Sequence, residues 1–172
     1  MTDKPLVGIL MGSDNDYEVM VEAARALRGF GIPYEMKVSS AHRSPERTAG
    51  YARMARQRGI RALIVGAGAA AHLAGVVAAE TTLPVIGVPI DSSALKGLDA
   101  LLSTVQMPAG IPVATMAIGK AGARNAGILA VQLLASGDEA LASRLSDFKA
   151  DMAKKVAEKS STVQERLAAD GL

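Results

Sequence analysis

Short hydrophobic runs alternate along the chain with longer stretches in which hydrophobic residues recur every three or four positions. The runs are typical of buried strands, and the longer stretches are typical of helices that pack one face against a sheet. Strands that alternate with helices indicate an α/β fold with a parallel sheet. The pattern predicts strands at residues 6–10, 34–39, 62–65, 84–88 and 113–118. It predicts helices at residues 16–28, 45–58, 71–80, 98–105 and 122–134, and a last one beyond residue 138.

Several helix ends and turns are marked by the residues expected there. Ser44 is placed as the N-cap of the second helix, Pro45 takes its first position, and Gly59 ends it. Gly66–Ala69 is expected to form a tight loop after the third strand. The stretch from Pro89 to Pro112 is the longest irregular region, and long ordered loops are often functional.

The last helix differs from the others in its surface. Beyond Gly137 and Asp138, hydrophobic residues recur at spacings of three and four opposite a charged face. This helix is therefore expected to lie on a surface or to pack against a neighbouring molecule, whereas the helix at 122–134 is apolar nearly all round and is expected to be buried. With 172 residues the chain is expected to form one domain, with a core at about 5–135 and a C-terminal helix at about 138–168. The recurring hydrophobic residues are Leu141, Leu145, Phe148, Met152 and Val156.

Composition disfavours several kinds of chemistry. The chain has no cysteine, which removes thiolate catalysis, disulfides and cysteine-ligated metal sites. Its two histidines, His42 and His72, cannot form a three-histidine metal site, so no metal is expected. A net charge of +2 and 3% aromatic residues do not favour a nucleic-acid partner, because single-strand binding usually needs basic grooves with aromatic rings.

Charged residues are distributed unevenly along the chain. Few occur between Ala62 and Ala123, so this stretch must form core, a subunit interface or a membrane span. Residues 62–79 are uncharged, but glycines, His72 and many alanines interrupt the hydrophobic pattern, so no membrane span is expected. The N-terminus lacks the pattern of a secretory signal, and the expected location is the cytoplasm. The charged residues within the stretch are Glu80, Asp91, Lys96, Asp99 and Lys120.

Three polar loops follow the first three predicted strands. In an open parallel sheet, ligands bind beyond the carboxyl ends of the strands, where loops lead into helix N-termini. The loop Gly12–Asp16 suits a phosphate, because free amide groups, a glycine and the Ser13 hydroxyl gather at a helix start. Asp16 would then accept hydrogen bonds from a sugar diol, although the same residues also suit an ordinary helix cap. The other two loops are Ser39–Arg43 and Gly66–His72.

The second loop carries more specific chemistry. Arg43 offers a planar fork for phosphate, and its neighbour His42 is the natural proton carrier near neutral pH. Both histidines lie in loops that are expected to open on the same edge of the sheet, although His72 is equally well explained as a structural histidine at a helix start. The basic residues from Arg47 to Arg61 scatter around a helix and are expected to form a solvated face.

Common catalytic motifs are missing from the sequence. There is no dinucleotide fingerprint, no nucleophile elbow, no zinc-protease motif and no Walker A sequence. On the residues alone, the prediction is an α/β protein that binds a small phosphorylated ligand and has His42 as a candidate acid and base.

Four segments stand in a recognisable order and spacing: Met11–Ser13 with Asp16, Ser40–Pro45, Gly66–Gly68 with Ala70–Leu73, and Gln106–Pro108 through Gly119–Gly122. Together they resemble class I of the PurE family. The resemblance covers about residues 5–135, and the final helix is similar only in character. It implies a flavodoxin-like three-layer fold, with helices on both faces of a parallel sheet. It also implies a homo-octamer whose sites are assembled where subunits meet.

The resemblance implies roles for single residues. Ser13 and Arg43 would hold the 5′-phosphate of a ribonucleotide, and Asp16 would hold its ribose hydroxyls. The loops of His42 and His72 would surround an aminoimidazole ring and its carboxyl group. Family members also bring the regions Ser92–Leu95 and Gln106–Pro108 near the site. The expected substrate-binding residues are Gly12, Ser13, Asp16, Ser40, Ala41, Arg43, Gly68, Ala70, His72 and Leu73.

The reaction implied by the resemblance converts N5-carboxyaminoimidazole ribonucleotide to 4-carboxy-5-aminoimidazole ribonucleotide in purine biosynthesis. It needs no cofactor, and His42 would both donate a proton to nitrogen and remove one from carbon. Two alternatives stay open: direct carboxylation of aminoimidazole ribonucleotide by carbon dioxide, and a non-catalytic nucleotide-binding module. The sequence departs from the family at Ala69, Ala74 and Ala109, and Ala69, in place of a common glycine, is expected to stiffen the third loop.

Overall fold

A computed structural model describes residues 4–172, and within them five parallel strands form one sheet in the order β2-β1-β3-β4-β5. This is the strand order of flavodoxin-like α/β proteins. The structure therefore confirms the predicted fold class. The strands are β1 (Val7–Met11), β2 (Tyr34–Val38), β3 (Ala62–Gly68), β4 (Val85–Ile90) and β5 (Ala114–Thr115).

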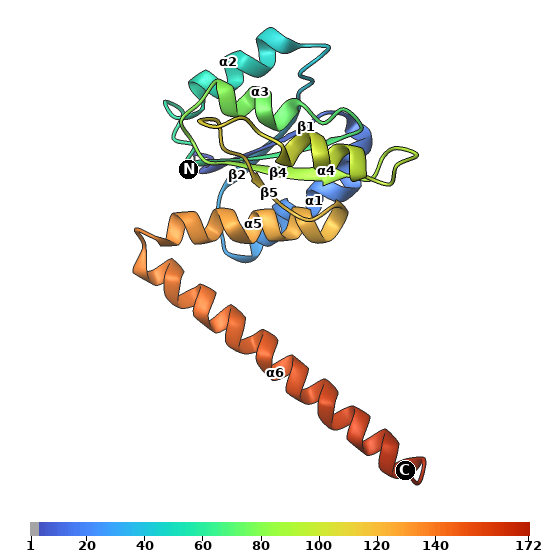
Figure 1. Cartoon of the computed structure of the whole chain (residues 1–172). Coiled ribbons are helices and arrows are strands. Elements are labelled where there is room, and N and C mark those ends of the chain that lie inside the picture. The colour runs from blue at the N-terminus through green and yellow to red at the C-terminus, as the bar shows by residue number, and fades with distance from the viewer. Residues whose placement is uncertain (1–3) are drawn as a thin grey trace. The chain divides into compact units, whose positions relative to one another are not determined.

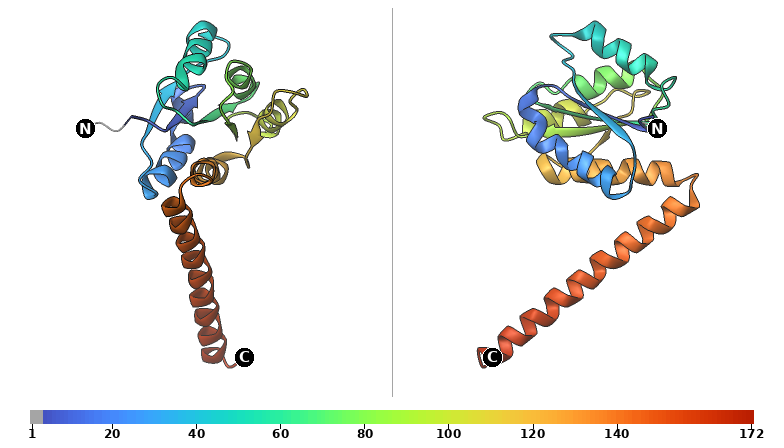
Figure 2. Two further views of the ribbon diagram at one scale, coloured as in Figure 1. Left: turned by 90° about the vertical axis from the view of Figure 1, so that its left-hand side faces the viewer. Right: turned by 180° about the vertical axis from the view of Figure 1, so that it is seen from behind.

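Helices cover both faces of this sheet. Figures 1 and 2 show α2 and α3 on one face and α1 and α5 on the other, which gives the expected three layers. A short 3-10 helix, η1 (Asp14–Asp16), leads from β1 into α1. The α-helices are α1 (Tyr17–Gly29), α2 (Pro45–Ala55), α3 (Leu73–Ala79), α4 (Leu98–Val105), α5 (Gly119–Ala135) and α6 (Glu139–Ala169).

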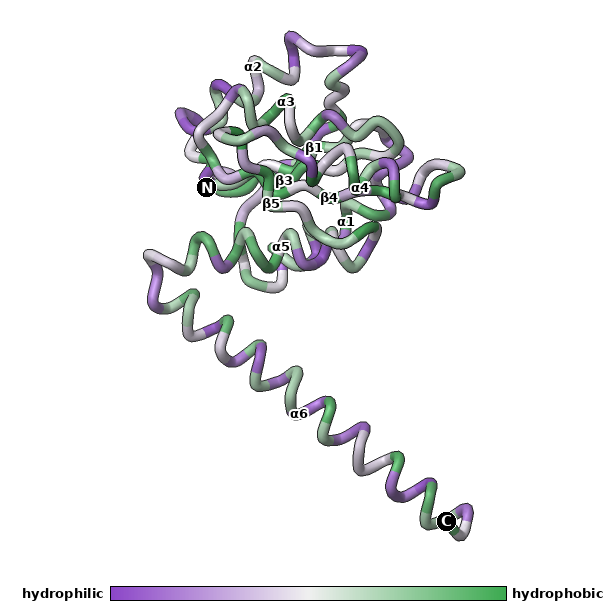
Figure 3. The backbone as a smooth tube through the Cα atoms, in the orientation of Figure 1, coloured by the Kyte–Doolittle hydropathy of each residue, from purple (hydrophilic) through white to green (hydrophobic). Residues whose placement is uncertain are grey.

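The core is centred on the three inner strands. Every residue of β1 and β4 is buried, as are the first five of β3. Because helices lie on both faces, these strands are hydrophobic on both sides instead of alternating with polar residues. Figure 3 shows hydrophobic colour along these inner strands. Among the largest fully buried side chains are Ile9, Leu10, Leu63, Ile64 and Ile86, each of which stabilises the fold by about 1.5–3 kcal/mol.

The third strand is longer than predicted. Gly66 and Gly68 pair with Val88 and Ile90 of β4, so the expected tight loop Gly66–Ala69 is mostly strand. The glycines serve close packing here, because a Cβ atom at Gly66 would lie 2.2 Å from the Met20 sulfur. From the sequence pattern the glycines are interpreted as turn residues, because the pattern does not show that Met20 packs against Gly66.

Other boundaries also differ from the predicted ones. Only Ala114 and Thr115 of the predicted strand at 113–118 pair with β4. The second helix ends at Ala55, three residues before its predicted end, and continues as a turn to Gly59. α5 begins at Gly119 and buries one face only, so the expectation of a helix buried all round is wrong. The short helix at 98–105 is confirmed.

The contacts of the chain divide it into two compact units, with the boundary between Leu134 and Ala135. The second unit, Ala135–Leu172, consists mainly of α6, a helix of 31 residues. The side chain of Asp138 caps it and accepts a hydrogen bond from the Leu141 amide at 3.0 Å. Figure 3 shows hydrophilic and hydrophobic residues alternating along this helix. Within residues 4–172, no helix is long and apolar enough to cross a membrane.

Candidate functional site

The loops after β1, β2 and β3 meet at one edge of the sheet. Met11, the last residue of β1, is in register with Val38 at the end of β2 and with Gly66 near the end of β3. The strand order reverses at β1, and in open α/β sheets the crevice at such a point binds ligands. Backbone topology alone therefore brings the three predicted loops together.

Ser13 and Asp16 close the first loop into a cap. The Ser13 Oγ accepts a hydrogen bond from the Asn15 amide at 3.3 Å, and Asp16 Oδ2 accepts one from the Ser13 amide at 3.0 Å. The two side chains thus form a capping box at the start of η1. Asp16 is buried, with 5% of its surface exposed. Burial raises the pKa of Asp16, and hydrogen bonds from the Ser13 and Gly12 amides only partly oppose this shift.

Replacing Asp16 with asparagine is expected to stabilise the unliganded protein at neutral pH. A carboxyl whose pKa is raised by folding contributes stability that is present below its unfolded pKa, near 3.8, and is lost as the pH rises through the folded value. At pH 7 the charged group therefore opposes folding. Thermal melts should give a higher Tm for Asp16→Asn at pH 7 and no difference from wild type at pH 3.

If Asp16 accepts hydrogen bonds from ribose hydroxyls, as the sequence predicts, the same variant should bind a ribose-containing ligand more weakly, by about tenfold or more, because it lacks the charged acceptor. Glu18→Gln, which removes an exposed carboxyl from the first turn of α1, is the matched control for the charge change. Equal Tm values for Asp16→Asn and wild type at pH 7 would contradict the conclusion that the buried charge of Asp16 opposes folding.

The second loop is held by a network of hydroxyl groups. The Ser40 carbonyl accepts hydrogen bonds from the Ser44 Oγ at 3.1 Å and from the Thr48 Oγ1 at 3.3 Å, and the Arg43 amide donates to the Ser40 Oγ at 3.2 Å. Ser39 Oγ and Thr48 Oγ1 share a buried hydrogen bond of 2.8 Å. Ser44 is the N-cap residue of α2, as predicted, although its side chain does not accept a hydrogen bond from the first turn of that helix. The Ser44 hydroxyl is engaged by the Ser40 backbone instead, which fixes the turn that carries His42 and Arg43.

The two histidines form a pair across this edge of the sheet. His42 Nε2 lies 2.9 Å from His72 Nδ1, and the two rings meet edge to face with their centroids 5.1 Å apart. One ring must donate the hydrogen bond and the other must accept it. Both side chains are exposed to solvent in the single chain. The His72 ring contacts His42 instead of capping α3, although His72 is the N-cap residue of that helix.

The third loop turns sharply after β3. Ala69 adopts a left-handed conformation with φ of 52°, which favours glycine over residues with a side chain. The Ala71 and His72 amides then donate to the carbonyl groups two residues earlier, both at 2.8 Å. Gly68 makes room for Ser92, since a Cβ atom at Gly68 would lie 1.7 Å from the Ser92 Oγ.

A cavity of about 180 Å³, here called the inner cavity, lies where the three loops meet. Of the residues predicted for the site, all except His72 line it, and His72 joins it through His42. Ala67 and Ser92 line it as well, and only the second of these lies in a region that the resemblance placed near the site. The lining residues are Gly12, Ser13, Asp16, Ser40, Ala41, His42, Arg43, Ala67, Gly68, Ala70, Leu73 and Ser92.

A second cavity of about 410 Å³, here called the outer cavity, shares Gly12, Ser13, Ser40 and Arg43 with the first. Five residues that line it were not predicted as site residues: Asp14, Lys37, Val38, Ser44 and Arg47. Arg47 was assigned to a solvated helix face. Lys37 lies at the carboxyl end of β2, next to the second loop, and a cation at this position is the sequence feature that could have indicated a further site residue.

The segment Gln106–Pro108 lines neither cavity of the single chain, so its expected place near a site formed between subunits stays a prediction. It connects the end of α4 to β5. Met107 packs near Gly75 of α3. Over the described residues 4–172, no three His, Cys, Asp or Glu side chains gather in an arrangement suited to a metal ion.

Fold and site together define a flavodoxin-like α/β protein with a polar cavity and a pair of histidines at the carboxyl edge of its sheet. A family model described as AIR carboxylase matches residues 6–155. The chain therefore belongs to the AIR carboxylase family.

Curated relatives and a solved structure agree with this assignment. The chain is 55% identical over 164 residues to the N5-carboxyaminoimidazole ribonucleotide mutase of Pyrococcus horikoshii, covering 95% of this chain and 92% of that protein. It is 56% identical over 157 residues to the mutase of the same name from Bacillus subtilis, covering 91% of this chain and 97% of that protein. The crystal structure of Treponema denticola PurE superposes with a TM-score of 0.83 at 29% identity, covering 92% of this chain and 98% of that one.

Proposed function

We propose that this chain is an N5-carboxyaminoimidazole ribonucleotide mutase, which moves a carboxyl group from the exocyclic nitrogen of an aminoimidazole ribonucleotide to ring carbon C4. Its relatives at about 55% identity carry this name. The observation that carries the proposal is the contact between His42 and His72, at 2.9 Å, beside a cavity formed by loops that suit a ribonucleotide.

The ribonucleotide would lie across the first two loops. Ser13 and Arg43 line both cavities and would hold the 5′-phosphate, a dianion that suits a planar guanidinium and a hydroxyl donor. Asp16, which lines only the inner cavity, would accept hydrogen bonds from the ribose hydroxyls. This directs the base toward the third loop, where Gly68, Ala70 and Leu73 form the wall of the cavity.

His42 would act first as an acid and then as a base. As an imidazolium it protonates the exocyclic nitrogen; the bond between that nitrogen and the carboxyl carbon breaks, its electron pair stays on nitrogen, and carbon dioxide is released. The enamine-like C4 then attacks carbon dioxide and forms a carbon–carbon bond. Neutral His42 removes the proton from C4, which restores the imidazolium. The proton balance closes on one residue, so no cofactor is needed.

His72 would position His42 and share its proton. The hydrogen bond between the rings would fix the orientation of the His42 imidazole, and whenever His42 is an imidazolium it donates this bond and neutral His72 accepts it.

A mutase assay separates this function from its alternatives. Purified protein is given the carbamate substrate in buffer depleted of bicarbonate, and formation of 4-carboxy-5-aminoimidazole ribonucleotide is followed. Product under these conditions supports the mutase. Product only from aminoimidazole ribonucleotide and added carbon dioxide indicates a direct carboxylase, and stoichiometric binding without turnover indicates a non-catalytic nucleotide-binding module.

Replacing Arg43 with alanine is expected to weaken binding of the phosphorylated substrate by about 10- to 100-fold, because a charge-assisted contact is lost. A ligand without the phosphate should bind wild type and Arg43→Ala about equally. Calorimetric titration with both ligands checks this, and Arg25→Ala, an exposed arginine on α1, is the matched control. Unchanged affinity for the phosphorylated ligand would argue against this role for Arg43.

We also propose that the chain works as a homo-oligomer, an octamer by its resemblance to PurE. Two observations support an assembly. Both histidines are exposed in the single chain, whereas released carbon dioxide must be retained beside C4. A contiguous hydrophobic stripe on and before α4 is also exposed, and such patches often mark interfaces. Its residues are Leu95, Leu98, Leu102 and Val105, each about half exposed or more.

Small-angle scattering and light scattering give the mass of the assembly, and charge substitutions at Leu98 and Leu102 should reduce this mass.

We expect the reaction to take place in the cytoplasm, and fractionation of cells that express the chain tests this.

A further inference from the structure

The outer cavity carries more positive charge than a single phosphate contact requires. Three cations line it, Lys37, Arg43 and Arg47, against one carboxylate, Asp14. Neither arginine forms an ion pair with a carboxylate within residues 4–172. Lys37 differs from both arginines because it already forms an ion pair, with Glu35 of the same strand.

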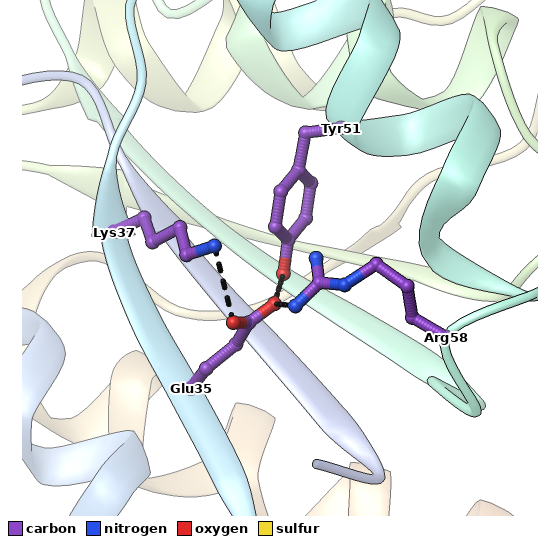
Figure 4. Close-up of polar contacts among 4 residues, drawn as sticks. All are labelled: Glu35, Lys37, Tyr51 and Arg58. Atoms are coloured by element: carbon purple, nitrogen blue, oxygen red, sulfur yellow. Dashed lines mark hydrogen bonds and ion pairs between the residues drawn. The ribbon is translucent and has the colours of Figure 1, made fainter. Parts of the chain in front are cut away.

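Lys37 belongs to a cluster between β2 and α2 that also contains Glu35, Tyr51 and Arg58 (Figure 4). Glu35 Oε1 accepts hydrogen bonds from the Tyr51 hydroxyl, at 2.8 Å, and from the Arg58 guanidinium. Lys37 Nζ contacts the other oxygen, Oε2, at 3.2 Å. Lys37 and Arg58 also each lie 5.3 Å from the centre of the Tyr51 ring.

The charge of this cluster does not need Lys37. Glu35 carries one negative charge, and Arg58 alone balances it, with the Tyr51 hydroxyl as a further donor. Burial would raise the pKa of Glu35, but the hydrogen bonds from Arg58, Tyr51 and Lys37 outweigh it and lower that pKa, so the carboxylate is ionised. The surplus cation is Lys37, whose side chain is 41% exposed and faces the outer cavity.

We propose that Lys37 is a specificity-determining residue that leaves Glu35 and binds the far side of a phosphate group in the outer cavity. This rests on the proposed function, because the ribonucleotide phosphate is placed at Ser13 and Arg43, where the two cavities join. Lys37 lines the same cavity as these two residues, and its flexible stem lets the ammonium group change partners without a change in the backbone. Glu35 then acts as the resting partner that competes with the ligand for the lysine.

If Glu35 and the phosphate compete for Lys37, substitutions of the two residues of this ion pair should shift ribose 5-phosphate affinity in opposite directions. Lys37→Met removes the cation, so ribose 5-phosphate should bind about tenfold more weakly. Glu35→Gln keeps an oxygen acceptor for Tyr51 and Arg58 but releases Lys37, so ribose 5-phosphate should bind about threefold more tightly. Affinity for ribose, which lacks the phosphate, should not change in either variant.

The experiment titrates the full chain with ribose 5-phosphate and with ribose, at pH 7.5, where the phosphate is mainly a dianion. Lys37→Arg keeps the charge and should retain the affinity of wild type within about threefold. Lys4→Met removes an exposed lysine at the amino edge of the sheet and is the matched control, with no expected change in affinity. Circular dichroism confirms that each variant is folded.

Several results would overturn the proposal. The first is that Lys37→Met binds ribose 5-phosphate as tightly as Lys4→Met does. The second is that Glu35→Gln binds it more weakly, as Lys37→Met does, because this is expected of a purely structural ion pair. The third is that Lys37→Arg loses affinity. Absence of any ribose 5-phosphate binding by wild type at millimolar concentrations overturns it too. The proposed function and the role of Lys37 can fail separately. If the protein lacks mutase activity but the two variants shift ribose 5-phosphate affinity in opposite directions, only the proposed function fails. If the protein is an active mutase and Lys37→Met does not change its ribose 5-phosphate affinity, only the role of Lys37 fails.

Discussion

Replacing His42 with asparagine is expected to lower turnover by at least about a hundredfold while substrate binding remains measurable. Asparagine has an amide that can take part in the hydrogen bond with His72, but it cannot carry a proton from nitrogen to carbon. In the proposed reaction both proton transfers pass through His42, so one substitution removes the acid and the base together. Stopped-flow turnover and calorimetric binding, measured on the same preparation, separate loss of chemistry from loss of affinity.

His72→Asn is the matched control for this experiment, because it makes the same change of residue type at the other end of the 2.9 Å contact. We expect a smaller loss of turnover, with a shifted pH–rate profile, since His42 keeps its proton but loses the ring that orients it. Near-normal turnover in His42→Asn would remove the assignment. A larger loss in His72→Asn than in His42→Asn would reverse the two roles.

The meeting of the two histidines shows what the sequence could predict. His42 and His72 are 30 positions apart, yet each follows a predicted strand, and parallel strands place such loops at one edge of the sheet. Topology was therefore sufficient to bring the residues to one site. It was not sufficient to show that the two rings touch, which depends on the turn at Ser40–Ser44 and on the left-handed residue Ala69.

Lys37 shows where sequence reasoning ends. In the strand Tyr34–Val38, Glu35 and Lys37 are separated by one residue and so lie on the same face, and from the pattern they form an ordinary surface pair on an edge strand. Their environment comes from Tyr51 and Arg58, which lie on and just beyond α2. Contacts between side chains so distant in sequence follow from packing, and no local pattern records them.

The glycines show the same limit from another direction. Gly66 and Gly68 were expected to mark a loop, but they lie in a strand where Met20 and Ser92 occupy the space of a side chain. A glycine in a sequence signals either a turn or a close approach of another part of the chain, and only the fold distinguishes the two. The resemblance to PurE gave the spacing of these glycines without giving their physical reason.

Replacing Gly122 with alanine is expected to destabilise the protein by about 3 kcal/mol, because backbone already occupies the position of the new methyl group. A Cβ atom at Gly122 would lie 1.6 Å from the carbonyl oxygen of Ala117 and 2.6 Å from its carbonyl carbon. The obstacle is main chain, which cannot rotate away as a side chain would. Gly122 itself is buried in the first turns of α5, so the helix start or the chain before it must move.

Gly50→Ala is the matched control, since it makes the same substitution within α2, where nothing lies within 4 Å of the added Cβ atom. It is expected to stabilise the protein by about 0.5–1 kcal/mol, because alanine favours the helix more than glycine does. Urea denaturation at one protein concentration, with a constant m-value, gives both differences, and equal concentrations matter if unfolding is coupled to assembly. Equal stability of the two variants would show that the backbone at Ala117 moves at little cost in free energy to make room for the methyl group of Gly122→Ala. The segment Gly119–Gly122 would then have to be explained by contact with substrate or with another subunit, and not by the close approach of the chain to the start of α5.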